Sequence, residues 1–452
     1  MLSVLKDKIE KFVGKSPLRT LAYSSIVAAN ASLLAKIIGF LKEVVVAYAF
    51  GLSEDLDIYL LAFVIIGFPL SVIINSTQTI LISQISATKN HRMQAEVYSF
   101  ILAISLIFIT LALFLFISGI DFTLPFLASG FSPEKITLLK KALFLLIPYY
   151  FFNGINLLAY GVMQSQGRFW LNGLLPITTP IVAILIIFFQ MDKTVWEVLV
   201  WALVIGTALE FVVLNLILIK DKMIALVKLG KVIKKDIYIG ILAILPGYVV
   251  FSLGQLIERS IAASLSSGTV AALGYGYRLP TAIYGILVTA VGITVLPYFS
   301  AMIGAKNFSY CMHSLKKITV ILFLSGLALA SVLFFLSDFI IFIFYRRGAF
   351  DDAASIIVSP IQKAYFMQIP FALIAILGTK ALAAMRMNGT ISILTIISVA
   401  IQAYLSFKLG ALLGGQGIAW ATTIGSASLA LCSISVVYLA LKRKLNEKSL
   451  FV

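Results

Sequence analysis

Three charged residues lie within the stretch AKIIGFLKEVVVAYAF, residues 35–50, which otherwise has the composition of a membrane helix. They are Lys36, Lys42 and Glu43. A charge at the centre of a bilayer costs several kcal/mol, so such side chains face protein or water and are functional by default. Lys36 lies about fifteen residues from either end of the expected helix, roughly 20 Å from each interface. A lysine stem cannot reach so far, and we therefore expect Lys36 to face a polar cavity.

Lys36 and Glu43 share one face of the expected helix, whereas Lys42 does not. Glu43 follows Lys36 by a helical rotation of about 20°, and Lys42 points about 120° away from Lys36. Gly39 lies between them and allows a bend that would bring Lys42 toward the same cavity. A local pair of Lys42 with Glu43 that serves only helix packing is the alternative interpretation.

Further charges lie within later apolar segments. Arg278 is about ten residues into the expected eighth helix and is followed by Pro280, which loosens the backbone there. Glu210 lies in the expected sixth helix, and Glu258 and Arg259 lie in the seventh. Packing explains these three as readily as function does, since Arg259 can reach the outer interface and Glu210 can neutralise a cation.

The cations that packing explains least, Lys36, Lys42 and Arg278, outnumber their nearest acid, Glu43. A cavity with excess positive charge suits an anionic ligand, and both Lys and Arg bind phosphate. The sequence therefore predicts a site for a phosphate-bearing amphipathic molecule. The two histidines and two cysteines are too few and too scattered for a metal site or a disulfide, so we expect no catalytic residue, metal or cofactor. Coupling to the membrane potential or to an ion gradient stays open.

The composition indicates which elements position these charges. The chain has 452 residues, 61% of them hydrophobic and 12% charged, with a mean hydropathy of +1.05. Soluble domains have about 25% charged residues, and a run of about 20 apolar residues spans a bilayer. We therefore predict an all-α polytopic membrane protein. The twelve expected spans are 21–50, 58–84, 96–120, 139–163, 169–190, 195–219, 237–263, 269–303, 316–345, 354–384, 389–409 and 416–441.

The expected spans group into two six-helix lobes. QSQGRFWLNG (164–173) and AAMRMNG (383–389) are similar turns six helices apart, as in transporters built from two related halves with a site between them. The predicted parts are a cytoplasmic lead-in (1–20), an N-terminal lobe (21–219), a basic cytoplasmic linker (220–236), a C-terminal lobe (237–441) and a cytoplasmic tail (442–452).

The charge distribution predicts the orientation. Lys and Arg collect at both ends and in alternate loops, above all in 220–236, whereas the loop GLSEDLD (51–57) is acidic. The positive-inside rule then places both termini in the cytoplasm. It also accounts for the net charge of +16, so we expect no nucleic-acid partner.

Several segments resemble one transporter family. AKIIGFLKEVVVAYAFGLSEDLDIYLLAF (35–63) resembles the first-helix signature of the MurJ/MviN family, and ALGYGYRLPTAIYGILVTAVGITVLPYFS (272–300) resembles its helix-eight segment. FYRRGAFD (344–351), MRMNGTIS (385–392) and GGQGIAWATTIGSASLAL (414–431) follow the family's order and spacing. The resemblance extends over nearly the whole chain.

The resemblance implies a function and a site. The family belongs to the multidrug/oligosaccharidyl-lipid/polysaccharide exporter superfamily and flips undecaprenyl-diphosphate-linked saccharides, above all lipid II. Its members are V-shaped, with two six-helix lobes that alternate between inward and outward states around a cationic cavity. Carried over by motif, the cavity charges fall on Lys36, Lys42, Glu43 and Arg278, and a further acid falls on Asp57.

The chain also departs from the family pattern. The stretch 64–80 has no charge where the family usually has Arg and Glu, and twelve helices are expected where fourteen are typical. A Wzx-like flippase for O-antigen, capsule or exopolysaccharide precursors is therefore the main alternative. A multidrug antiporter would need acids in the cavity, and a membrane enzyme would need acidic or His residues on large outer loops. We expect a non-enzymatic monomer in the bacterial cytoplasmic membrane, with cell-wall or polysaccharide synthesis enzymes as its partners.

Overall fold

The computed structural model describes residues 17–189, 194–227, 230–305 and 307–449. All regular elements in these ranges are helices, and the β-bridge between Arg347 and Phe350 is isolated. The predicted all-α class is confirmed. Residues 1–16 of the expected lead-in lie outside the described residues, and the first described helix begins at Pro17.

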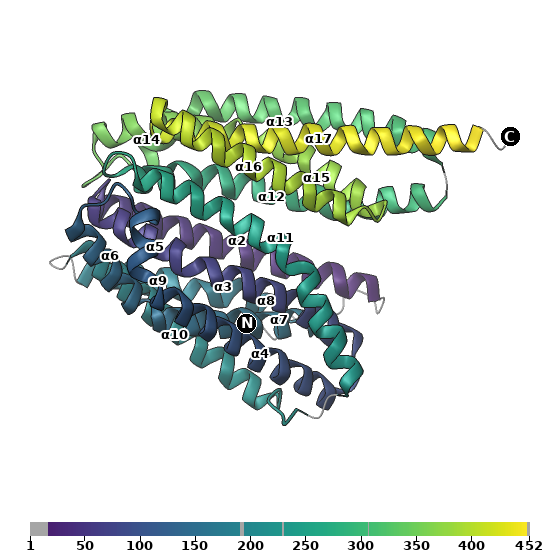
Figure 1. The fold of residues 1–452 in the computed structure, drawn as a ribbon, viewed down its shortest axis with the longest axis horizontal. Helices are drawn as coiled ribbons and strands as arrows, with labels where there is room; N and C mark the ends of the chain where they lie inside the picture. The colour runs from purple at the N-terminus through teal and green to yellow at the C-terminus, as the bar shows by residue number, and fades with distance from the viewer. Residues whose placement is uncertain (1–16, 190–193, 228–229, 306, 450–452) are drawn as a thin grey trace. The chain divides into compact units, whose positions relative to one another are not determined.

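Figure 1 shows the helices with their labels. In chain order they are α2 (Pro17–Phe50), α3 (Glu54–Ala87), α4 (His91–Ser118), α5 (Ile120–Leu127), α6 (Pro133–Leu145), α7 (Ile147–Ser165), α8 (Phe169–Leu174), the 3-10 helix η1 (Leu175–Ile177), α9 (Thr178–Phe189), α10 (Val195–Lys220), α11 (Lys231–Ala263), α12 (Thr269–Gly304), α13 (Phe308–Phe344), α14 (Asp352–Phe366), α15 (Ile369–Ala384), α16 (Asn388–Leu413) and α17 (Gly415–Ser449).

Most of these helices are long and apolar enough to cross a membrane. Ten spans in the described part meet that condition, or eleven when the bent pair α6–α7 counts as one. Every span expected from the sequence coincides with one of the helices or helix groups. α2, which contains the three charges, is not among the ten, so the total of twelve depends on α2 crossing the membrane and stays a prediction.

Three of the expected spans are broken at prolines. Pro148 lies in the first turn of α7, which is bent by 45° from α6. Pro176 lies in η1, between α8 and α9, and Pro370 lies in the first turn of α15. Proline lacks an N–H and disrupts a helix interior, whereas the first turn of a new helix accepts it readily. These prolines therefore restart the helix within the membrane segment.

The connection and the tail are more helical than expected. α10 ends at Lys220 and α11 begins at Lys231, so residues 221–230 connect them. α17 continues to Ser449 and includes most of the expected tail. Lysine and arginine have good helix propensity, which explains why these basic segments extend helices.

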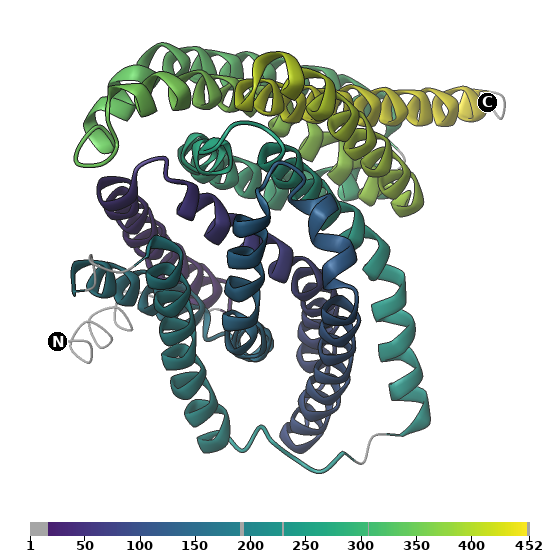
Figure 2. The ribbon, with the colours of Figure 1, turned by 60° about the vertical axis from the view of Figure 1, so that its left-hand side comes forward.

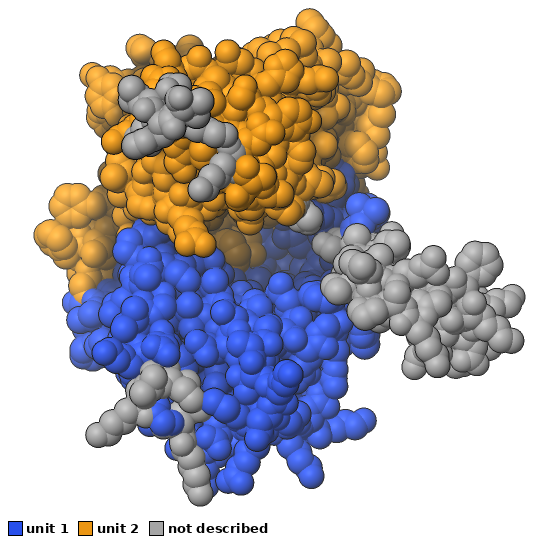
Figure 3. Space-filling model, turned by 90° about the vertical axis from the view of Figure 1, so that its right-hand side faces the viewer, with its two compact units in different colours: residues 1–45, 69–118, 143–248 blue, residues 46–68, 119–142, 249–452 orange. Residues whose placement is uncertain are grey.

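The chain divides into two compact units, coloured in Figure 3. The first consists of residues 1–45, 69–118 and 143–248, and the second of residues 46–68, 119–142 and 249–452. α2, α3, α6 and α11 contribute residues to both units. The two sequence lobes 21–219 and 237–441 follow a different boundary and stay a prediction.

Close helix packing at small residues characterises the first unit. α10 packs against α7 and α9. A Cβ atom at Gly206 of α10 would lie 2.7 Å from Cα of Thr179, so only glycine permits this approach. The Nδ2 group of Asn156 donates to the carbonyl of Thr207 at 3.1 Å. Small residues and buried amides are typical of helix contacts in membranes.

The second unit is a bundle of α12 to α17 with the adjoining ends of earlier helices. α16 and α17 form its most extensive helix pair, and α13 and α17 run side by side in Figures 1 and 2. One core cluster includes Phe299 of α12, Leu315 of α13 and Leu441 of α17. These side chains fix the positions of α13 and α17.

Candidate functional site

The charges of α2 differ in their surroundings. Lys36 lies near the middle of the helix with an exposed side chain, and it forms no ion pair with any residue in the described ranges. Six residues later, the Nζ atom of Lys42 lies 2.7 Å from Oε1 of Glu43, and these side chains are only 19% and 10% exposed. The sequence predicted that these charges face a cavity, with a local pair of Lys42 and Glu43 as the alternative; the structure contains an exposed Lys36 and a largely buried pair.

Arg278 lies on α12 with an exposed side chain, two residues before Pro280. Its neighbour Tyr277 has its ring 5.0 Å from the ring of Tyr365. The hydroxyl groups of Tyr277 and Tyr284 are 3.2 Å apart. Arg278 is thus a cation on a long apolar helix, beside a cluster of tyrosines.

The proposed cavity cations belong to different units. Lys36, Lys42 and Glu43 are residues of the first unit, and Arg278 is a residue of the second. Lys36 and Arg278 are both exposed, and their meeting in one cavity stays a proposal.

Asp57 binds the start of the helix that carries Arg278. Its Oδ2 atom accepts a hydrogen bond from the N–H of Gly268, and its Oδ1 atom accepts one from the N–H of Ala271, both at 2.7 Å. The side chain is buried. A carboxylate at a helix N-terminus satisfies unpaired N–H groups and complements the helix dipole. Asp57 therefore acts as the cap of α12 although it belongs to α3.

Other charges surround the same helix start. Arg259 donates from its guanidinium to the carbonyl of Val270 at 2.9 Å, next to Ala271. Lys135 forms a 2.8 Å ion pair with Glu54, and both line a small pocket with Asp57. The sequence left two roles open for Arg259, packing and function. In the structure its guanidinium contacts the beginning of α12 through this hydrogen bond.

Glu210 is buried among hydroxyl groups in the first unit. Its carboxylate accepts hydrogen bonds from the Tyr160 hydroxyl at 2.9 Å and from the Thr179 hydroxyl at 2.6 Å. These partners come from α7 and α9, so Glu210 of α10 joins three helices. Neither partner is the cation that the sequence interpretation considered.

Glu258 has the same role in the second unit, with partners on three helices. The Tyr365 hydroxyl of α14 donates to its Oε1 atom at 2.5 Å. The Gln402 amide of α16 and the Thr422 hydroxyl of α17 both lie 3.3 Å from its Oε2 atom. α16 and α17 contain no Asp or Glu among residues 388–441, yet a carboxylate from α11 reaches both of them.

The partners of Glu210 and Glu258 were not identified from the sequence. Gln402 and Thr422 are polar residues within apolar segments, a signal that membrane helices use polar side chains to bind one another. Tyr160 and Tyr365 gave no such signal among many tyrosines. Within the described residues there is no group of three or more His, Cys, Asp or Glu that could hold a metal ion.

The sequence matches a known family and known relatives. The family model described as "Lipid II flippase MurJ" matches residues 46–450. The lipid II flippase MurJ of Thermosipho africanus is 24% identical over 424 residues, which cover 93% of this chain and 85% of that protein.

Solved structures have the same fold. A structure described as lipid II flippase MurJ in an inward closed conformation has a TM-score of 0.76 at 22% identity, and covers 92% of this chain and 90% of its own. An inward-facing multidrug resistance transporter of the MATE family and MOP superfamily has a TM-score of 0.75 at 14% identity, with 93% of this chain and 99% of its own covered. These likenesses support the exporter fold expected from the sequence.

Proposed function

This chain belongs to the lipid II flippase MurJ family, and from this premise we propose that it moves lipid II across the membrane. The general substrate class is an undecaprenyl-diphosphate-linked saccharide. The observation that carries the proposal in this chain is Lys36, an exposed lysine near the middle of the 34-residue helix α2, which we expect to cross the membrane. A cation at that depth needs a polar or anionic partner.

The proposed mechanism needs binding and movement but no catalytic residue. Lobes 21–219 and 237–441 alternate between an inward and an outward opening, and the headgroup crosses in the cavity between them. Lys36 and Arg278 attract the diphosphate from the two lobes. The chain is accordingly a transporter and not an enzyme.

Lys42 and Glu43 adjust this attraction. The 2.7 Å pair leaves Lys42 partly neutralised, which weakens its hold on a phosphate. Because transport requires release as well as binding, a moderated cation suits a flippase better than an isolated one. Moving one net charge across a membrane potential of 100 mV changes its free energy by about 2.3 kcal/mol. The membrane potential is therefore the proposed driving force.

The remaining charges are proposed to hold the moving parts together. Asp57 and Arg259 fix the start of α12, which positions Arg278. Glu210 joins three helices through hydroxyl donors, and Glu258 joins four through hydroxyl and amide donors. Rigid groups of helices allow a lobe to move as one body.

The setting of the protein follows from its family and its charges. The chain is a multi-pass membrane protein. We propose that it is a monomer in the bacterial cytoplasmic membrane. The positive-inside rule supports an orientation with both termini in the cytoplasm. Enzymes that make the lipid-linked precursor and polymerise the saccharide are its proposed partners.

The test is growth of a bacterium whose own lipid II flippase is depleted. We expect this chain to restore growth and a Lys36→Ala, Arg278→Ala double variant to fail. A matched control is the double variant Lys89→Ala, Lys317→Ala, which removes two exposed cations outside the proposed cavity. Immunoblots of isolated membranes verify equal insertion.

The outcomes separate the function from the site. Growth with both the natural chain and the Lys36, Arg278 variant would refute the phosphate-binding role but not lipid II flipping. Failure of a well-inserted natural chain would favour the Wzx-like alternative, and rescue of O-antigen or capsule flippase mutants would then identify that function.

A further inference from the structure

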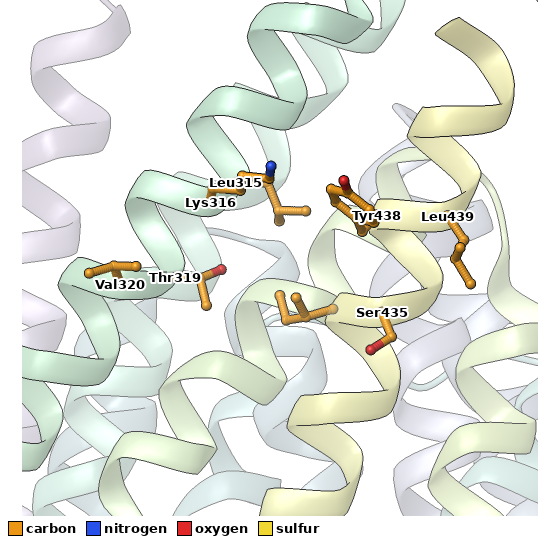
Figure 4. Close-up of a pocket in the computed structure, with 8 residues that line it drawn as sticks. Leu315, Lys316, Thr319, Val320, Ser435, Tyr438 and Leu439 are labelled. Carbon is orange, nitrogen blue, oxygen red and sulfur yellow. The ribbon is translucent and has the colours of Figure 1, made fainter. Parts of the chain in front are cut away.

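An open groove lies between the beginning of α13 and the end of α17 in the second unit, with a volume of about 590 Å³ (Figure 4). Leu315 and Ile434 line it, and Leu315 is fully buried in the core cluster of this unit. Val320 and Leu439 line it as well and are exposed. The groove thus has apolar walls on a rigid base, which suits a hydrocarbon chain.

Polar groups lie at one end of this groove. The Nζ atom of Lys316 lies 5.1 Å from the centre of the Tyr438 ring, and Figure 4 shows the two side chains from opposite helices near each other. Thr319 belongs to the groove lining, but its Oγ1 atom is buried and is not exposed to the groove.

Further cations follow on both helices. Lys317 is next to Lys316, and Lys442, Arg443 and Lys444 lie about one turn after Tyr438. Lys444 lies over the ring of Phe308 at 5.4 Å. Away from these cations, both helices are mainly apolar. A basic cluster at the end of membrane helices marks the cytoplasmic interface and attracts anionic lipids.

We propose that this groove binds one anionic glycerophospholipid of the cytoplasmic leaflet. Lys316 binds the phosphate, and one acyl chain lies along Val320, Ile434 and Leu439. Charge complementarity selects an anionic headgroup, and the apolar groove selects a lipid over a soluble phosphate. The bound lipid bridges α13 and α17. This proposal does not depend on the substrate that the protein transports.

The test measures lipid binding to the purified full chain by native mass spectrometry, with phosphatidylglycerol and phosphatidylcholine as probes. We expect phosphatidylglycerol to bind at least about fivefold more tightly, since a lysine near an anionic lipid surface contributes about 1 kcal/mol. Lys316→Glu should remove this preference, and Lys316→Arg should retain it. Lys317→Glu is the matched control, because it changes the same charge one residue away from the groove lining.

A second pair of variants tests the apolar part. Leu439→Trp places a large ring in the groove and should reduce phosphatidylglycerol binding at least about fivefold, in line with the loss of one site. Leu431→Trp is its control, because Leu431 is a similarly exposed residue of α17 outside the groove lining, at 68% compared with 62% for Leu439.

Four results would overturn the proposal. Equal losses with Lys316→Glu and Lys317→Glu would indicate a diffuse surface charge. Equal binding of both lipids would indicate an apolar groove without headgroup selection. Displacement of phosphatidylglycerol by purified lipid II in proportion to its concentration would identify the substrate as the occupant. A dimer in the spectrum that Leu439→Trp abolishes would identify a second copy of the chain.

Discussion

Asp57 of α3 accepts hydrogen bonds from the backbone N–H groups of Gly268 and Ala271, which lie 211 and 214 residues later in the chain. Gly268 has a φ of +82°, and a Cβ atom there would lie 3.0 Å from the carbonyl oxygen of Leu52. Glycine is therefore needed both for the backbone conformation and for the contact. The acidic segment after α2 and the first turn of α12 form one structural element of the second unit.

Replacement of Asp57 by alanine should loosen the first turn of α12. Two buried N–H groups would lose their acceptor, and loss of such a partner costs about 1–3 kcal/mol for each group. We expect a lower thermal unfolding midpoint in detergent and faster hydrogen exchange in peptides that contain residues 268–272. Asp57→Asn should have a smaller effect, because the amide oxygen still accepts one of the two bonds.

Asp55→Ala is the control for this change. Asp55 carries the same charge in the same first turn of α3, while Asp57 bonds both N–H groups of α12. The capping role would be contradicted if hydrogen exchange at residues 268–272 were as slow in Asp57→Ala as in Asp55→Ala.

Apolar composition was enough to predict the helical class and the position of the long apolar helices. It did not predict the breaks at Pro148, Pro176 and Pro370, because hydropathy averages over a window and a proline changes the average little. Nor did it predict helical structure for residues 442–449, where basic residues outside an apolar run were interpreted as a tail. Charged residues of good helix propensity can simply continue a membrane helix.

The candidate site residues were predicted from single charges within apolar runs, and their roles stay predictions. A charge within an apolar run identified Lys36, Glu210 and Glu258. The partners were not predictable, since they lie on other helices and hydrogen bonding depends on three-dimensional contact. Tyr365 and Glu258 are 107 residues apart in sequence, and no local pattern connects them.

Glu258 should be essential for the stability of the second unit. Its carboxylate is an acceptor for Tyr365, Gln402 and Thr422. Glu258→Ala would leave the buried Tyr365 hydroxyl without its acceptor, at about 1–3 kcal/mol, whereas Thr422 and Gln402 keep bonds to the Ile418 carbonyl and the Thr422 hydroxyl. We expect a markedly lower unfolding midpoint, and a smaller decrease for Glu258→Gln, whose amide oxygen can still accept from Tyr365.

Glu54→Ala is the matched control for Glu258→Ala. Glu54 forms an ion pair with Lys135, but its side chain is 57% exposed, and exposed pairs contribute about 0–1 kcal/mol. An equal decrease of the midpoint for both variants would contradict the role assigned to the buried cluster.

Arg386→Gly should stabilise the protein. α7 and α15 end in the same way, with a 2.8 Å bond from the N–H of Arg168 to Met163 and a 3.0 Å bond from the N–H of Met387 to Leu382. The residue before each donor has a positive φ, which is 76° for Gly167 and 61° for Arg386. A left-handed conformation costs a non-glycine residue about 1–2 kcal/mol.

The expected gain for Arg386→Gly is about 0.5–1 kcal/mol, because glycine also increases the entropy of the unfolded chain. Arg386 is exposed, so its side chain contributes little packing. Thermal unfolding in detergent measures the change. Arg168→Gly, the control in the related turn, should not stabilise, since Arg168 has a φ of −85° and pairs with Asp221. A lower midpoint for Arg386→Gly would contradict this account.

Neutralising Lys42 and Glu43 together distinguishes a substrate-binding lysine from a packing pair. If the 2.7 Å pair only stabilised α2, the double variant Lys42→Gln, Glu43→Gln would remove both charges together and leave neither of them unpaired. It would then restore growth as well as the natural chain does. A lysine that also binds the diphosphate contributes about 1.5–3 kcal/mol through a charged hydrogen bond. We therefore expect at least tenfold lower plating efficiency in the depletion strain at equal membrane abundance.

The control for that double variant is Lys135→Gln, Glu54→Gln, which neutralises a pair of similar length, 2.8 Å, at the beginning of α3. It should restore growth fully, because Lys135 lies beside the cap of α12 and not in the proposed path of the headgroup. Full growth with both double variants would reduce Lys42 to a packing residue and leave Lys36 and Arg278 as the proposed diphosphate ligands.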